Sequence, residues 1–122
     1  IVQQIPKAWD ADGNSIYPQI KGEKGHPRKW IFTHYNPLHS EEINKQAARF
    51  FRDHRYKLYQ DGRFYDLVKD PEETNPVAEG NGTPEAELVR KTFKREFAKL
   101  PAWKPGDPGK PKREYPGLEI KK

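Results

Sequence analysis

The clearest pattern in this chain is a series of short segments rich in aromatic and β-branched residues. Residues 29–35 (KWIFTHY) alternate two sets of such side chains, which is typical of a strand. Residues 47–53 (AARFFRD), 55–60 (RYKLYQ) and 63–67 (RFYDL) also favour strands. Because turn residues separate these segments, they predict a small antiparallel sheet.

The turn between the last two segments sets their expected register. Asp61 and Gly62 tolerate positive φ, as a two-residue type I′ turn requires. This turn would place Lys57 opposite Asp66, and opposite charges in such a cross-strand pair contribute about 0.2–1 kcal/mol. We therefore interpret Asp66 as the partner of Lys57, and Asp70 as a turn residue in the segment DPEETN.

A long helix is expected before the C-terminal region. Thr83 is a suitable N-cap, Pro84 and two glutamates follow it in the first turn, and Pro101 ends the helix. Apolar residues recur near helical spacing and form one stripe, made of Leu88, Phe93, Phe97 and Leu100. The stripe and one sheet face predict an α+β fold: a small antiparallel sheet of about four strands with one C-terminal helix packed on it.

These elements divide the chain into three regions. Residues 1–29 are rich in Pro, Gly and Lys and are expected to form an extended lead-in, with a turn of helix at 15–20. Residues 30–101 form the α+β subdomain, with a further helical turn expected at 41–45. Residues 102–122 have no regular period, and their prolines and lysines predict an extended tail.

Composition points to a thin core. Hydrophobic residues make up 33% of the chain, below the roughly 45–50% of an ordinary globular domain. This value suggests disordered ends, a missing partner surface, or both. The net charge is +5, of which residues 102–122 supply +3 (6 Lys/Arg against 3 Asp/Glu). Since the positive residues do not cluster, a solvated surface is favoured over binding to nucleic acid or another polyanion.

Few residues offer chemistry. The chain has no cysteine, which excludes a thiol nucleophile and a Cys-ligated zinc. Neither serine lies in a nucleophile-elbow pattern, and the four histidines lack metal-ligand spacing. No apolar run approaches the roughly 20 residues that span a bilayer. We therefore predict no catalytic and no metal-binding residues. His34, at the end of the first strand, is of interest as a single residue.

The hairpin resembles the C-terminal signature of the type I sulfatases, the arylsulfatase-like family. The matching elements are Tyr-Lys-Leu at 56–58, Tyr-Asp-Leu at 65–67, and Asp70-Pro71 followed by Glu73 and Asn75. Residues 10–35 are similar to the linker of that family, with Asp-Gly at 12–13 and Lys-Gly at 21–22. The resemblance covers roughly residues 8–100 and leaves the tail unmatched.

This resemblance implies a C-terminal subdomain docked beside a larger catalytic α/β domain. In that family the larger domain carries formylglycine and a divalent cation, usually calcium. The motifs for both are absent from this chain, so no cofactor is expected within it. The implied partners are the N-terminal sulfatase catalytic domain and a sulfated substrate, such as a sulfated glycan or an aryl sulfate, with no nucleic acid and no membrane. The resemblance also implies a periplasmic or secreted full-length protein.

Within this interpretation, the chain would line one side of the substrate cleft and be inactive alone. His34 and Tyr35, with the loop 36–40, are the residues expected to contact the substrate. The alternative function is a free-standing binding module for a protein partner or an anionic glycan.

Overall fold

The computed structural model describes residues 13–37 and 39–107. The chain divides into two compact units, Ile1–Pro27 with Lys110–Lys122, and Arg28–Gly109. In the described part of the first unit, α1 (Tyr17–Ile20) confirms the helical turn expected there, with a proline in its first turn. Residues 1–12 of the predicted lead-in and residues 108–122 of the predicted tail lie outside the described residues.

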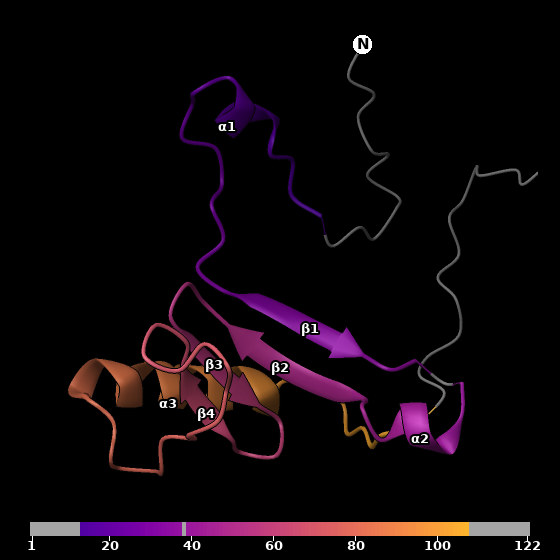
Figure 1. The fold of residues 1–122 in the computed structure, drawn as a ribbon. Helices are drawn as coiled ribbons and strands as arrows, with labels where there is room; N and C mark the ends of the chain where they lie inside the picture. Colours follow the sequence, from indigo (N-terminus) through magenta and orange to yellow (C-terminus); the bar gives the residue numbers. More distant parts are fainter. Residues whose placement is uncertain (1–12, 38, 108–122) are drawn as a thin grey trace, which may run out of the picture. The chain divides into compact units, whose positions relative to one another are not determined.

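The second unit is a four-stranded antiparallel sheet with the strand order β1-β2-β3-β4 (Figure 1). Together with α3, this sheet confirms the predicted α+β class with a small antiparallel sheet of about four strands. The expected turn between the first two strands forms α2 (Glu41–Asn44), with Ser40 as N-cap. The other elements are β1 (Ile31–Tyr35), β2 (Ala48–Arg52), β3 (Tyr56–Tyr59), β4 (Phe64–Asp66) and α3 (Pro84–Ala98).

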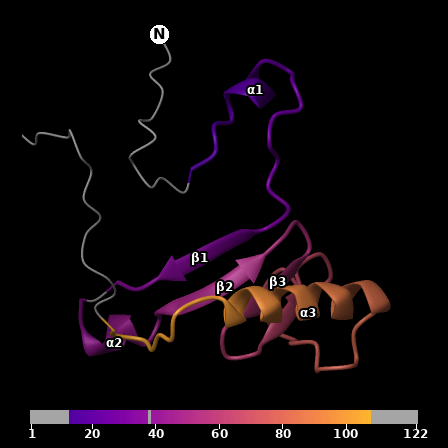
Figure 2. The same ribbon diagram turned by 180° about the vertical axis from the view of Figure 1, so that it is seen from behind.

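Helix α3 covers one face of the sheet (Figure 2). It begins as predicted, because the Thr83 side chain accepts a hydrogen bond from the backbone N–H of Ala86. The predicted apolar stripe is wrong at Leu88, which is 65% exposed, whereas Phe93 is 1% exposed. Phe93 lies five positions after Leu88, a rotation of about 140° around the helix at 100° per residue. The buried face therefore passes through Ala86, Arg90 and Phe93.

The core lies between α3 and the sheet face that carries Phe51, Leu58 and Phe64. The rings of Phe51 and Phe93 stack with centroids 5.9 Å apart, and Phe97 meets Phe51 edge-on at 4.8 Å. Burial of each such side chain contributes about 1.5–3 kcal/mol. A few aromatic residues therefore account for most of the apolar packing in this polar chain.

The hairpin between β3 and β4 corrects the predicted register. Its loop has three residues, since the N–H of Tyr59 donates to the carbonyl of Arg63 (2.9 Å) and that of Gly62 donates to Tyr59 (3.0 Å). Gly62 has φ +98°. A three-residue loop with one left-handed glycine needs positive φ only there, whereas the predicted type I′ turn also needs it at Asp61. The pairing is therefore shifted by one residue.

The shifted register changes the expected charge pair. Lys57 pairs in the ladder with Tyr65, and Asp66 pairs with Tyr56. Because successive residues of a strand point to opposite faces, Lys57 and Asp66 lie on opposite sides of the sheet. The prediction that they are partners is wrong.

The second unit also extends further than the predicted subdomain. Trp103, which the sequence assigns to the tail, is 8% exposed. Its carbonyl accepts a hydrogen bond from the side-chain amide of Gln60 at 3.2 Å. The segment after α3 therefore packs against the end of the sheet.

Candidate functional site: a cationic pocket at the end of the sheet

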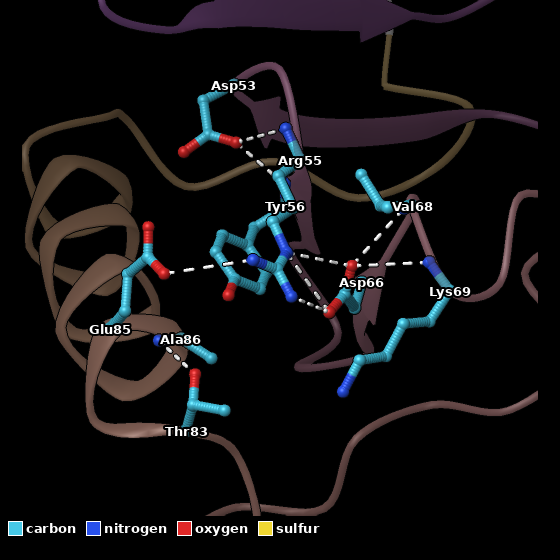
Figure 3. A network of polar contacts seen from close by, with 9 residues as sticks. All are labelled: Asp53, Arg55, Tyr56, Asp66, Val68, Lys69, Thr83, Glu85 and Ala86. Carbon is cyan, nitrogen blue, oxygen red and sulfur yellow. Dashed lines mark hydrogen bonds and ion pairs between the residues drawn. The ribbon is translucent and has the colours of Figure 1, made fainter.

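The acidic residues of the hairpin motif stabilise the fold. Asp66 accepts hydrogen bonds from the Arg55 guanidinium at 2.9–3.2 Å and from the backbone N–H groups of Val68 and Lys69 (Figure 3). The hydrogen bond from Arg55 is the main cause that lowers the pKa of Asp66. A carboxylate engaged in this way is held in its charged form and is not available as a general acid.

Two further carboxylates support the same hairpin. Asp53 accepts the backbone N–H groups of Arg55 (2.8 Å) and Tyr56 (2.6 Å), which shapes the turn into β3. Glu85, in the first turn of α3, lies 3.8 Å from the Arg55 guanidinium. Arg55 therefore links the hairpin to the helix (Figure 3).

Asp70 has the turn role that its sequence indicates. Its carboxylate accepts the backbone N–H groups of Asn75 (2.8 Å) and Thr74 (3.0 Å), and also the Thr74 hydroxyl (3.0 Å). The hydrogen bond from Asn75, followed by that from Thr74, lowers the pKa of Asp70. The segment DPEETN is therefore a turn closed by its own aspartate.

Lys57 finds its counter-ion in the same segment. Its ammonium lies 3.0 Å from the Glu73 carboxylate and 4.2 Å from the centre of the Phe50 ring. Glu73 has φ +54°, a left-handed conformation that non-glycine residues rarely adopt. Lys57 is only 9% exposed. The strained backbone of Glu73 therefore holds its carboxylate beside a buried cation, which requires a counter-ion.

The two predicted substrate residues point to different faces of the sheet. His34 and Tyr35 are neighbours on β1, so their side chains alternate. His34 lies on the face of Arg49, its ladder partner, and its ring is 4.8 Å from that of Trp103. Tyr35 is 48% exposed on the other face. In the loop 36–40, Asn36 donates to the carbonyl of Asp107 at 2.7 Å, and Leu38 lies outside the described residues.

His34 belongs to a polar cluster. Its Nδ1 accepts a hydrogen bond from Nε of Arg49 at 3.4 Å, which requires any proton on the neutral ring to be on Nε2. Burial, and then repulsion from the Arg49 guanidinium, lower the pKa of His34. At neutral pH His34 is therefore an uncharged acceptor that orients Arg49.

Beside this cluster is a pocket of about 190 Å³, which we call the Arg49 pocket. It lies where β2 begins and the β3–β4 hairpin turns. Arg49 and Trp103 are its most buried side chains, each 8% exposed. The guanidinium carbon of Arg49 is 5.0 Å from the centre of the Trp103 ring. The lining residues are Ala47, Ala48, Arg49, Tyr59, Gln60, Asp61, Arg63, Trp103 and Pro105.

A second pocket, of about 340 Å³, lies between the hairpin and the start of α3. Tyr56 lines it, and the buried hydroxyl of Tyr56 has no hydrogen-bond partner among the described residues. However, its two carboxylates, Asp66 and Asp70, are already engaged by Arg55 and by the turn. The Arg49 pocket is therefore the stronger candidate for a binding site.

Sequence reasoning did not single out Arg49 or Trp103. One signal was present, since Arg49 occurs two residues before Phe51 and so shares its core-facing side of the strand. A charged residue at an inward position of a strand indicates either a buried ion pair or a binding site. Trp103 gave no local signal, because its burial depends on how the segment after α3 returns to the sheet.

Comparisons with known proteins leave the family open. No model of a known protein family matches the chain, and no curated protein matches it. Within residues 13–37 and 39–107, no group of three or more His, Asp or Glu side chains could hold a metal ion. In the same part of the chain, no helix has the length and apolar character to cross a membrane.

Proposed function

We propose that this chain is the C-terminal portion of a sulfatase, a sulfuric ester hydrolase. It completes the fold of the enzyme and lines one side of the substrate cleft. The catalytic domain, with its formylglycine and calcium ion, is the N-terminal partner, and the chain is inactive without it. The substrate is a sulfated glycan or an aryl sulfate.

The Arg49 pocket is the observation that carries this proposal. A sulfated substrate needs cationic donors, and a guanidinium binds oxoanions through two parallel hydrogen bonds. The pocket offers Arg49 and Arg63, while His34 lies directly beside Arg49. Sulfate-ester hydrolysis also needs an activated nucleophile, and the motif carboxylates Asp66 and Asp70 are engaged within the fold. This combination fits a cleft wall better than a complete active site.

The free edge of the sheet supports a docked partner. Among the described residues, strand β1 has a neighbour on one side only, and it exposes Ile31 (43%), Phe32 (38%) and Tyr35 (48%). An edge strand with exposed apolar side chains favours contact with another protein surface. We assign this edge to the contact with the catalytic domain.

The alternative is a free-standing module that binds an anionic glycan. It is favoured by the compact second unit, which encloses its own aromatic core and carries the Arg49 pocket. The two functions differ in one respect: the sulfatase portion works only together with a catalytic domain, whereas the binding module works without one.

An aryl sulfate assay separates them. We expect no turnover by the 122-residue chain, and turnover by a longer gene product that contains it together with the catalytic domain. Replacement of the formylglycine precursor in the longer product is the matched control, and it should abolish turnover. Turnover by the 122-residue chain alone would refute the proposal. A gene that encodes no catalytic domain, together with no gain of activity when a separate one is added, would favour the binding module.

A further inference from the structure

Arg49 is a buried cation that lacks a direct counter-ion in the described part of the chain. Its Nη1 donates to the carbonyl of Pro101 at 2.9 Å, and its Nε donates to His34. None of the described carboxylates lies within ion-pair distance of it; Asp107 attracts it from further away. Burial lowers the pKa of Arg49. Because an uncompensated buried charge is costly, a ligand anion would be stabilised here.

The surrounding groups suit the same anion. The indole N–H of Trp103 is buried and has no acceptor among the described residues. Arg63 adds a second guanidinium, and Asp61, which also lines the pocket, already binds Arg63 at 2.8 Å. Two arginines and one aspartate leave the lining with a net charge of +1. Unpaired donors and a net positive charge both select an acceptor with negative charge.

The size of the pocket limits the ligand. A volume of about 190 Å³ is below the roughly 300–1,000 Å³ of sites for drug-sized molecules. It exceeds what a single oxoanion fills, and its remaining walls, apart from the amide side chain of Gln60, are apolar or aromatic, including Tyr59 and Pro105. The ligand should therefore be an oxoanion attached to one small ring.

We infer that the Arg49 pocket binds the sulfate or carboxylate group of one sugar ring in an anionic glycan. The choice of a sugar rests on the proposed function, whereas the choice of an oxoanion rests on Arg49, Arg63 and Trp103. No described lining residue of the pocket is an activated nucleophile, so the inferred role of these residues is binding. Burial raises the pKa of Tyr59, so its phenol stays protonated at neutral pH.

Nuclear magnetic resonance of the 122-residue chain provides the test. The chain has three tryptophans, Trp9, Trp30 and Trp103, so the Trp103 indole N–H signal can be assigned by its loss in Trp103→Phe. We expect this signal to shift on titration with glucose 6-sulfate or glucuronate. Titration with inorganic sulfate should shift it less, and neutral glucose should leave it unchanged.

Variants then assign the binding to the pocket. Arg49→Gln should weaken binding of glucose 6-sulfate about tenfold or more, because hydrogen bonds to charged groups are strong. Arg49→Lys should recover only part of the loss, since lysine lacks the planar fork. Arg52→Gln is the matched control, because Arg52 is on the same strand but not in the lining, and it should bind like the wild type. If Arg49→Gln does not fold, Arg63→Gln, at a half-exposed side chain, tests the same pocket.

Three outcomes would overturn the inference. They are no shift of the Trp103 signal with either sugar anion, equal affinity for glucose and glucose 6-sulfate, or unchanged affinity for glucose 6-sulfate in both Arg49→Gln and Arg63→Gln. Equal affinity for inorganic sulfate and for the sugar anions would overturn the assignment of a sugar ring. These results are independent of the aryl sulfate assay. Sulfatase activity in the longer product, without binding of the sugar anions at the Arg49 pocket, would refute this inference alone. Binding of the sugar anions at the pocket, without sulfatase activity in the longer product, would refute the proposed function alone.

Discussion

Replacing Asp66 by asparagine tests whether the hairpin depends on its ion pair. The substitution keeps the shape of the side chain but removes the charge and puts an NH₂ group where one oxygen accepts from Arg55. Asp66 is 8% exposed and accepts hydrogen bonds from the Arg55 side chain and from two backbone N–H groups. After the change, at least one of these donors loses its acceptor.

The expected cost follows from this geometry. Removal of one partner from a fully buried ion pair costs about 3–5 kcal/mol. Here the Arg55 side chain is 36% exposed, so solvent compensates part of the loss and we expect about 2–3 kcal/mol for Asp66→Asn. A unit of this length has about 4–12 kcal/mol of stability in total. The variant should therefore unfold at a clearly lower urea concentration.

Urea unfolding followed by circular dichroism at neutral pH measures this difference. Glu79→Gln is the matched control, because the Glu79–Lys94 pair is also short (2.7 Å) but both side chains are exposed. This control should unfold with the wild type. In an Arg55→Gln background, Asp66→Asn should cost less than half as much as in the wild type. In a Lys57→Gln background its cost should be unchanged, because Lys57 lies on the other face.

Acid provides a second signature. Arg55 lowers the pKa of Asp66 below its ordinary value of 3.8. The stabilisation is therefore complete above that pH and is lost as the pH falls through the lower value of the folded state. The difference in stability between wild type and Asp66→Asn should shrink over this range. A cost for Asp66→Asn equal to that of Glu79→Gln, or coupling to Lys57 instead of Arg55, would refute this account of the hairpin.

Three further predictions test the core, the opposite face and the pocket edge. Phe93→Ala should cost about 3–5 kcal/mol in urea unfolding, while Leu88→Ala, on the exposed side of α3, should change stability by about 0.5 kcal/mol or less; similar costs would contradict the placement of α3. Glu73→Gln should cost about 1–3 kcal/mol, because it leaves the buried Lys57 ammonium without a counter-ion, and an unchanged urea midpoint would contradict this. Since burial and Arg49 lower the pKa of His34 below 6.5, the unfolded chain takes up the proton first, so wild-type stability should fall as the pH drops below that value. The stability of His34→Gln should lack the part of this fall that His34 causes. Parallel profiles of stability against pH for the wild type and His34→Gln would exclude the effect.

Features that depend only on neighbouring residues could be predicted from the sequence. The helix α3 starts after Thr83 as predicted, because an N-cap and a following proline act through the nearest backbone groups. Asp70 closes its own turn for the same reason. The four strands appear in the segments that are rich in aromatic and β-branched residues, since this preference depends on the residue types within each segment.

The errors arise where two distant parts of the chain meet. Asp61-Gly62 is compatible with loops of two or three residues, and the choice moves Asp66 from Lys57 to Arg55. Leu88 is near helical spacing from the rest of the predicted stripe, but the buried face of α3 passes through Ala86, Arg90 and Phe93 and leaves Leu88 exposed.

Within the described residues, the sequence by itself determined four strands, one long helix and the places where turns connect them. It also determined that the chain has no thiol, since it contains no cysteine. Only the tertiary structure decided that Arg49 and Trp103 share one pocket, and that His34 contacts both of these side chains while Tyr35 lies on the other face of the sheet. The physical reason is that periodicity and capping act over a few residues, whereas a pocket forms where strands, turns and a returning segment pack together.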